Sequence, residues 1–220
     1  GLSIETQNGN IFDSLAVIIA SGSSLKHLGI PGEEENHGTG VSYCATCDGA
    51  FFKDQVVGVV GGGDSALDEA ITLTEFASKV FLIHKGKEFV GQRLLQDRVK
   101  ANPQIEIISQ TIIESINGNS GVEAVTINNT RSGERSILSL QGLFIYIGLS
   151  PNTQYLRDLL PLDTAGHIPT DLLMRTPVRG VLAAGDIRQH SAAQLISSAG
   201  DGATAAISAQ RYIDRQEWTQ

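Results

Sequence analysis

The two cysteines of the chain, Cys44 and Cys47, are separated by two residues and followed directly by Asp48. A pair at this spacing can close a small disulfide, and no other cysteine in the sequence competes for either thiol. A zinc site is one alternative, but structural zinc needs several ligands and only His37 lies close in sequence. Two packed thiols without chemistry are another, because free cysteine often behaves as a small apolar residue. We predict a dithiol that cycles between reduced and oxidised forms, and no metal site.

A glycine-rich turn is the second chemical signal. Residues 61–66 read Gly-Gly-Gly-Asp-Ser-Ala, between a predicted buried strand at 55–60 and a predicted helix that runs to Leu73, and a second strand follows at 79–83. In the dinucleotide-binding pattern, glycines permit a tight turn and a close approach to a pyrophosphate, and the helix N-terminus favours phosphate. A plain tight turn is the alternative. The order of elements favours nucleotide binding by Gly61, Gly62, Gly63, Asp64, Ser65 and Ala66.

The residues at the end of the second strand determine the specificity for NAD or NADP. An acid at that point holds the ribose hydroxyls of NAD, whereas a 2′-phosphate calls for basic groups. Here His84 and Lys85 are followed by Lys87, and the first acid comes only at Glu88. NADPH is therefore predicted, with NADH as the alternative. The lysines could equally belong to a solvated turn, because exposed lysine is common.

The composition fits an acidic enzyme rather than a partner of nucleic acid or membranes. The chain has 220 residues, 41% of them hydrophobic, which is enough for one large domain or two modest ones. Its net charge of −8 opposes binding to polyphosphate or anionic lipid. Neither an apolar run of the ~20 residues that span a bilayer nor a leader is present, so the cytoplasm is the expected compartment. The sequence starts without Met in a predicted strand, which suggests a fragment.

Apolar patterns and turn residues predict the other elements. A continuous apolar strand, buried on both faces, is expected at 14–20. The glutamates at 33–35 are expected in a solvated loop. The further strands are predicted at residues 104–109, 112–116, 122–128, 135–140 and 143–147, and the further helices at residues 94–101 and 194–213.

The order of these elements predicts an α/β fold in which one domain is inserted into another. Proline and glycine residues at 29–40 and at 148–152 mark two crossings between domains. We therefore expect a Rossmann-like NAD(P)-binding domain at 26–149 that carries the dithiol. It would interrupt a second domain formed by residues 1–25 and 150–220.

A short apolar strand near the C-terminus ends in Gly185 and Asp186. An aspartate at the carboxyl end of a parallel strand can accept a hydrogen bond from a cofactor hydroxyl, although an N-cap for the next helix explains it equally well. The helix that follows is rich in alanine and contains Gly200 and Gly202, so it can pack closely on a cofactor or on a neighbouring helix.

Three motifs in a fixed order resemble those of one family. Cys-Ala-Thr-Cys-Asp-Gly at 44–49, the glycine-rich turn at 61–66 and Gly-Val-Leu-Ala-Ala-Gly-Asp at 180–186 closely resemble the low-molecular-weight thioredoxin reductases, which are pyridine nucleotide-disulfide oxidoreductases. The resemblance covers essentially the whole chain. It implies a homodimeric enzyme that passes electrons from NADPH through FAD to the dithiol, and on to a disulfide of thioredoxin or a similar protein. In that family an FAD-binding domain is split by the NADPH-binding domain.

The resemblance also implies roles for single residues. Cys47 would face the flavin, Cys44 would attack the disulfide of thioredoxin, and Asp48 would move their protons. Asp186 would bind the ribityl chain of FAD, and Gln194 would lie near its ring system. The remaining cofactor-binding residues that the resemblance implies, besides the glycine-rich turn, are His84, Lys85, Gly148 and Gly185.

Three features depart from the family pattern. No glycine-rich FAD fingerprint precedes Gly1, so the FAD-binding domain is expected to be incomplete and flavin binding poor. Lys85 and Gly86 replace the arginines that read a 2′-phosphate, and lysine lacks their two-pronged guanidinium. Ala193 stands where an arginine usually precedes the glutamine. The alternatives are a catalytically inactive NAD(P)-binding fragment and a related flavin reductase with another electron donor or partner.

Overall fold

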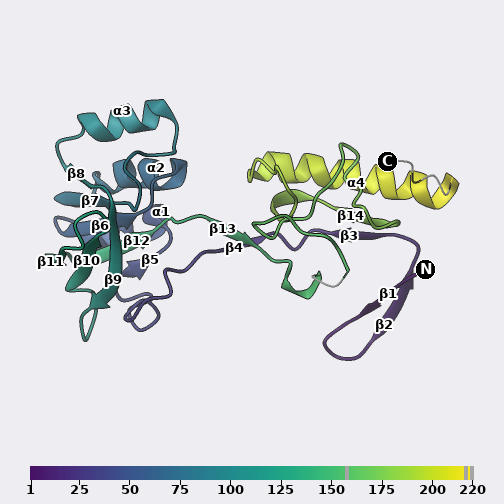
Figure 1. Ribbon diagram of the computed structural model, residues 1–220, viewed down its shortest axis with the longest axis horizontal. Helices are drawn as coiled ribbons and strands as arrows, with labels where there is room; N and C mark the ends of the chain where they lie inside the picture. Colours follow the sequence, from purple (N-terminus) through teal and green to yellow (C-terminus); the bar gives the residue numbers. More distant parts are fainter. Residues whose placement is uncertain (157–158, 216–217, 219–220) are drawn as a thin grey trace. The chain divides into compact units, whose positions relative to one another are not determined.

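The computed structural model describes residues 1–156, 159–215 and 218, and it divides the chain into two compact units (Figure 1). Unit 1 combines Gly1–Ser24 with Leu149–Gln220, and unit 2 is Leu25–Gly148. Unit 2 is therefore inserted in sequence between the two parts of unit 1. Among the described residues, no helix is long and apolar enough to cross a membrane.

Unit 2 is built on a five-stranded parallel sheet in the order β5-β12-β6-β7-β8. Parallel strands need crossover connections, and two helices, α2 and α3, provide them from β6 to β7 and from β7 to β8. The predicted α/β fold with a parallel sheet is confirmed. The elements are β5 (Val41–Ser42), β6 (Val56–Val60), α2 (Asp64–Leu73), β7 (Lys79–Ile83), α3 (Arg93–Ala101), β8 (Ile105–Ile108) and β12 (Gly142–Ile145).

Both faces of this sheet are buried, which explains its nearly continuous apolar strands. Successive side chains of a strand point to opposite faces, so Val80 and Leu82 of β7 pack with the helices while Phe81 and Ile83 pack on the other side. An antiparallel sheet in the order β11-β10-β9 contributes to that second core. Its strands β9 (Thr111–Asn117), β10 (Ala124–Asn129) and β11 (Arg135–Ser139) correspond to the strands predicted at 112–116, 122–128 and 135–140.

Unit 1 has β14 (Val181–Ala183) at its centre, paired in parallel with β3 (Val17–Ile19). Val181 and Ala183 pack into one core cluster, and Leu182 packs into another beneath α4 (Leu195–Arg215), which lies along both strands in Figure 1. The other elements are the hairpin β1 (Leu2–Glu5) and β2 (Ile11–Ser14), the paired strands β4 (Ser23–Leu25) and β13 (Leu149–Pro151), and the 3₁₀ helices η2 (Gln154–Leu156) and η3 (Gly185–Ile187).

The strand predicted at 14–20 is shorter and less buried than expected. Only Val17–Ile19 forms β3, Leu15 is exposed, and Ile18 is 40% exposed. Ile18 lines an open cavity instead of entering the core, so the prediction that both faces are buried was wrong.

The stretch at 29–40 is part of unit 2 and not a crossing between units. Its backbone hydrogen bonds run back into unit 2, from Ile116 N to Pro31 O and from Leu143 N to Gly40 O. Glu33 was predicted to be solvated, but it is only 4% exposed. Its buried carboxylate accepts hydrogen bonds from Leu28 N at 3.0 Å and from Gly29 N at 2.7 Å. A buried carboxylate saturated by donors avoids the usual cost of burying charge.

Candidate functional site

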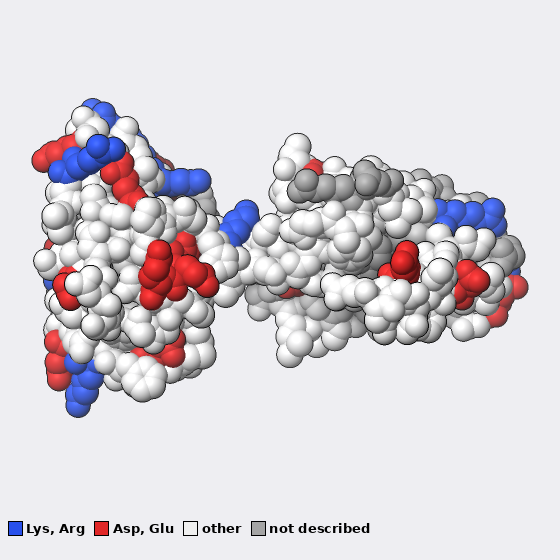
Figure 2. Space-filling view, turned by 90° about the horizontal axis from the view of Figure 1, so that it is seen from below, with Lys and Arg blue, Asp and Glu red and all other residues white. Residues whose placement is uncertain are grey.

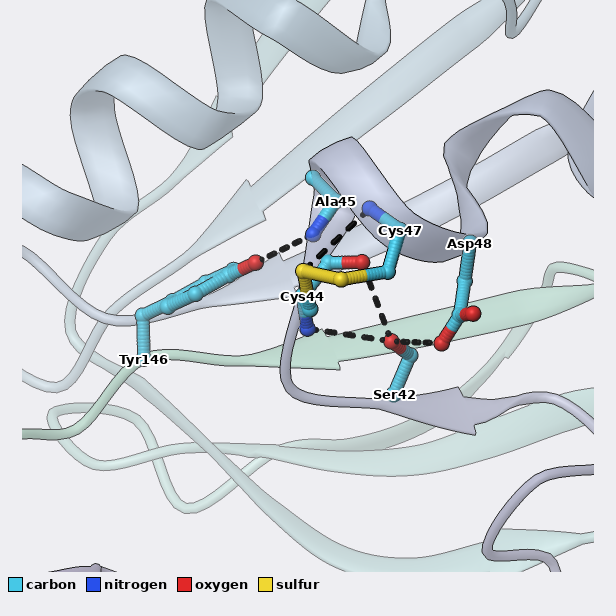
Figure 3. The surroundings of a disulfide bond; sticks show 6 residues. All are labelled: Ser42, Cys44, Ala45, Cys47, Asp48 and Tyr146. Carbon is cyan, nitrogen blue, oxygen red and sulfur yellow. Dashed lines mark hydrogen bonds between the residues drawn. A yellow bond between two sulfur atoms is a disulfide. The ribbon is translucent and has the colours of Figure 1, made fainter.

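The dithiol lies at the start of a short helix, α1 (Ala45–Asp48), in unit 2 (Figure 3). Cys44 is the N-cap residue, and its sulfur accepts a hydrogen bond from Cys47 N at 3.2 Å. Residues three apart on a helical turn lie on one side, so the two sulfurs meet in a disulfide with Cα atoms 5.3 Å apart. Cys47 is exposed and Cys44 is partly buried, which leaves the bond open to a reductant.

Asp48 is fixed beside the disulfide by Ser42, the last residue of β5. The Ser42 hydroxyl donates to Asp48 Oδ2 at 2.6 Å and accepts from Cys44 N at 3.1 Å (Figure 3). Ser42 itself is buried. One hydroxyl therefore joins the backbone of the first cysteine to the only carboxylate in the motif.

Tyr146 holds the other side of α1. Its hydroxyl accepts a hydrogen bond from Ala45 N at 2.7 Å, so one free amide at the helix start is satisfied (Figure 3). Burial raises the pKa of Tyr146, and the negative charges of Glu69 and Asp48 add to that shift, so the phenol stays protonated. Burial, assisted by Asp68, also raises the pKa of Glu69, whose buried Oε2 has no hydrogen-bond partner among the described residues.

The glycine-rich turn after β6 has the geometry that its sequence predicted. Gly61 has φ of 145°, and a Cβ there would strike Tyr146 O and come within 2.8 Å of Ala66 Cβ. Only glycine fits such a position. Gly63 is the N-cap of α2, and the space where its Cβ would stand is open. The start of α2 is therefore accessible to an anionic group.

The segment between β7 and α3 is fastened against this turn. Val90 N and Gly91 N donate to Gly62 O at 2.9 and 3.1 Å. The Asp64 carboxylate accepts from Gln92 N at 2.6 Å and from Gln92 Nε2 at 3.0 Å, and these hydrogen bonds lower the pKa of Asp64. Of the two residues predicted at the end of β7, His84 lies beside the turn, since a Cβ on Gly62 would be 3.3 Å from His84 Nδ1.

His84 and Lys85 occupy different environments within that segment. His84 is 5% exposed and stacks on Phe89 with ring centroids 4.4 Å apart, and burial lowers the pKa of its imidazole. The ring is therefore neutral near pH 7 and supplies no positive charge. Lys85 and Lys87 are both exposed, so either can offer a positive charge to a ligand at this point.

Unit 1 contains a cavity of about 240 Å³ at the carboxyl ends of β3 and β14. Asp186 lies at its wall in η3, and its Oδ1 accepts a hydrogen bond from Ser198 Oγ of α4 at 3.0 Å. Asp186 is therefore not the N-cap of α4. The cavity is lined by Ile18, Ala20, Gly22, Ala184, Gly185, Asp186, Ser198 and Gly202.

Two predicted cofactor-binding residues lie apart from these features. Gln194 precedes α4, is exposed and is not among the residues that line the cavity; its carbonyl accepts from Ser198 N at 3.0 Å. Gly148 ends unit 2 with φ of 101°, and its carbonyl accepts from Lys26 N at 3.0 Å. Among the described residues, no group of three or more His, Cys, Asp or Glu side chains is placed to hold a metal ion.

Sequence reasoning missed several residues that support the predicted ones. The spacing of Ser42 from Cys44 could have indicated a hydroxyl beside the dithiol, and Ser198 and Asp201 stand three apart on one face of a predicted helix. Nothing local points to Tyr146, which is 101 residues from Ala45. The missed residues are Ser42, Tyr146, Gln92, Ser198, Arg188 and Asp201.

Comparison with known proteins gives a consistent result. The family model described as pyridine nucleotide-disulphide oxidoreductase matches residues 2–206. The chain belongs to this family. The predicted family resemblance is therefore confirmed, and with it the assignment of the chain to a class of oxidoreductases.

Individual members of this oxidoreductase family are also similar to the chain. The thioredoxin reductase of Bacillus subtilis is 43% identical over 209 residues, which cover 94% of this chain and 66% of that protein. The thioredoxin reductase of Peptoclostridium litorale is 42% identical, with 92% and 66% covered. Among solved structures, the thioredoxin reductase of Lactococcus lactis has a TM-score of 0.87 at 39% identity, with 96% of this chain and 70% of that chain covered. The chain thus spans about two thirds of the length of the relatives that it matches.

Proposed function

We propose that the protein passes electrons from a reduced nicotinamide nucleotide, through FAD, to the Cys44–Cys47 disulfide, and from the dithiol to a disulfide of thioredoxin or a similar protein. The observation that carries this proposal is an accessible disulfide beside the carboxylate of Asp48, on the same unit as a nucleotide-binding turn. The names of the similar proteins support it.

The exchange steps use this chain's own sulfurs. The Cys44 thiolate attacks the partner's disulfide, forming a mixed disulfide and releasing one partner thiolate. The Cys47 thiolate then attacks Cys44 Sγ, which restores the Cys44–Cys47 bond and releases the second partner thiolate. Two electrons leave the dithiol and two protons are taken up by the partner's sulfurs; Asp48 delivers one proton and solvent the other. A reduced flavin, when bound, would supply the two electrons that open the disulfide again.

The cavity of unit 1 fits part of a flavin cofactor. Ligand pockets usually measure roughly 300–1,000 Å³, so a volume of about 240 Å³ suits only a portion of FAD. Small residues leave room for a chain, and Oδ2 of Asp186 accepts no hydrogen bond from the described residues, so it is available to a ribityl hydroxyl. Gly185 and Gln194 would complete this region.

The turn at 61–66 and Lys85 fit a nicotinamide nucleotide. The open start of α2 would receive the pyrophosphate, and the exposed Lys85 would lie near a 2′-phosphate, since His84 is buried and neutral. We therefore propose NADPH over NADH. Gly148, at the end of unit 2, would belong to the same set of cofactor contacts.

A cytoplasmic homodimer without a nucleic-acid partner is part of the same proposal. Figure 2 shows acidic groups and no continuous basic surface on the face of unit 2 in view.

Stopped-flow kinetics on the full protein tests this function. Reduction of thioredoxin disulfide should proceed with NADPH, at least about tenfold more slowly with NADH, and should vanish in Cys47→Ser. Lys100→Ala, which removes an exposed lysine from the end of α3, should leave the preference for NADPH over NADH unchanged. Equal rates with NADPH and NADH would show that Lys85 does not recognise a 2′-phosphate. Retained turnover in Cys47→Ser would overturn the proposed function itself.

A further inference from the structure

A largely buried ion pair lies next to the cavity of unit 1, because Asp201 is hydrogen-bonded to Gly185, which lines that cavity. Arg188 Nε donates to Asp201 Oδ2 at 2.5 Å and Arg188 Nη2 donates to Asp201 Oδ1 at 2.8 Å. The exposed fractions of the two side chains are 16% and 9%. Such two-pronged pairs fix geometry as well as charge. The Arg188 hydrogen bonds hold the pKa of Asp201 below its usual range, so the carboxylate stays ionised at neutral pH.

The same carboxylate also holds the turn that precedes Asp186. Gly185 N donates to Asp201 Oδ2 at 3.1 Å. Gly185 has φ of 80°, a left-handed conformation that glycine adopts readily and other residues do not, and a Cβ there would lie 3.3 Å from Ser198 Oγ. The hydrogen bond to Asp201 therefore stabilises one backbone conformation of Gly185.

Helix α4 thus holds Asp186 through two side chains one turn apart. Ser198 occupies Oδ1 of Asp186, and Asp201 holds the preceding amide. Arg188, two residues after Asp186, binds the Asp201 carboxylate in turn. Oδ1 of Asp186 is therefore hydrogen-bonded within the protein. Oδ2 of Asp186 accepts no hydrogen bond in the part of the chain that the structure describes.

We propose that Arg188 and Asp201 are positioning residues for the flavin, which hold Asp186 in the orientation that receives a ribityl hydroxyl. This inference rests on the proposed function, because it names supports for the flavin-binding carboxylate. It assigns to the ion pair a role in affinity for FAD that is separate from its contribution to the stability of the fold.

The same unit offers a matched control. Arg175 Nε and Nη2 donate to Asp171 Oδ2 at 2.7 and 2.6 Å, and the exposed fractions of these side chains are 15% and 30%. Asp171 also accepts from backbone amides, as Asp201 does. Neither residue of this second pair lines the cavity.

Titration of the full apoprotein with FAD, together with thermal unfolding without FAD, tests the inference. Asp201→Asn should weaken FAD binding about tenfold, as expected for losing hydrogen bonds to a charged group, whereas Asp171→Asn should change it less than about twofold. Both variants should lower the unfolding temperature. If the two variants weaken FAD binding equally, the ion pair is merely structural and the inference is overturned while the proposed function stands.

A double variant separates the two roles further. Arg188→Asp with Asp201→Arg can restore the ion pair, but a guanidinium has no acceptor for Gly185 N. The unfolding temperature should recover relative to Asp201→Asn, and FAD binding should not. Recovery of both would overturn the inference. Failure of the unsubstituted protein to bind FAD would instead contradict the proposed function, and the inference with it.

Discussion

At the scale of single residues, the dithiol depends on groups that its own motif does not contain. The Cys-x-x-Cys spacing brings the sulfurs together, but Ser42 orients Asp48 and Tyr146 satisfies Ala45 N. Exchange chemistry needs a thiolate on one sulfur and a proton for another. A carboxylate held beside the disulfide can serve that second need, whereas a freely rotating one would do so less often.

Replacing Asp48 by asparagine should separate proton transfer from electron supply. The amide side chain would still accept a hydrogen bond from the Ser42 hydroxyl but could not take up or release a proton. Turnover with a disulfide partner should fall by about 100-fold, the scale of general acid–base catalysis, while reduction of bound FAD by NADPH stays unchanged. The control is Asp54→Asn, an exposed carboxylate nearby in sequence. Turnover above half of the original value in the Asp48→Asn variant would contradict this role.

At the scale of elements, the loop before the dithiol is anchored by a buried carboxylate. Glu33 accepts from Leu28 N, Gly29 N and the Tyr43 hydroxyl, the last at 2.8 Å, and Tyr43 directly precedes Cys44. Burial alone would raise the pKa of Glu33, but the hydrogen bonds from Tyr43, Leu28 and Gly29 outweigh it and leave the pKa below 4.5. The loop at 28–33 and the dithiol segment are therefore joined through one charged group.

This anchor predicts a specific dependence of stability on pH. The folded pKa of Glu33 lies below the unfolded one, so the unfolded chain takes up the proton first as pH falls. The stabilisation is complete above about pH 4.5 and is lost as pH falls toward the folded pKa. Glu33→Gln should reduce the unfolding free energy at pH 7 by about 2 kcal/mol and flatten the decline of that free energy as the pH falls below about 4.5.

Urea unfolding at several pH values measures this effect. Glu123→Gln, which changes an exposed carboxylate of unit 2, should behave like the unsubstituted protein. If the Glu33→Gln variant and the unsubstituted protein lose stability in parallel on acidification, Glu33 does not anchor the loop.

Elements whose signals are local could be predicted from the sequence, and those set by distant contacts could not. The turn at 61–66, α2 and β7 were predicted with nearly correct bounds, because glycines, a helix start and a continuous apolar run are all encoded within a few residues. Glu33 looked like a solvated residue because its donors come from backbone amides and a tyrosine that only the folded loop brings together. Likewise, the exposure of Ile18 follows from the cavity beside β3, which composition does not reveal.

At the scale of the whole molecule, two units carry the two halves of the proposed chemistry. Unit 2 holds the disulfide and the glycine-rich turn at 61–66, and unit 1 holds the cavity at Asp186. The order of the motifs was sufficient to predict the family, which the comparisons confirm. The supports of Asp186 could not be predicted, because Arg188 and Asp201 meet only when η3 and α4 fold against each other.

In the proposed function, electrons from NADPH reach the sulfurs of Cys44 and Cys47. Anaerobic addition of NADPH to the full protein with FAD, followed by alkylation and peptide mapping, tests it most directly. We expect two newly alkylated thiols in each chain, at Cys44 and Cys47, with none in samples that lack NADPH. Reduction of the flavin without any alkylation at these two residues would contradict it.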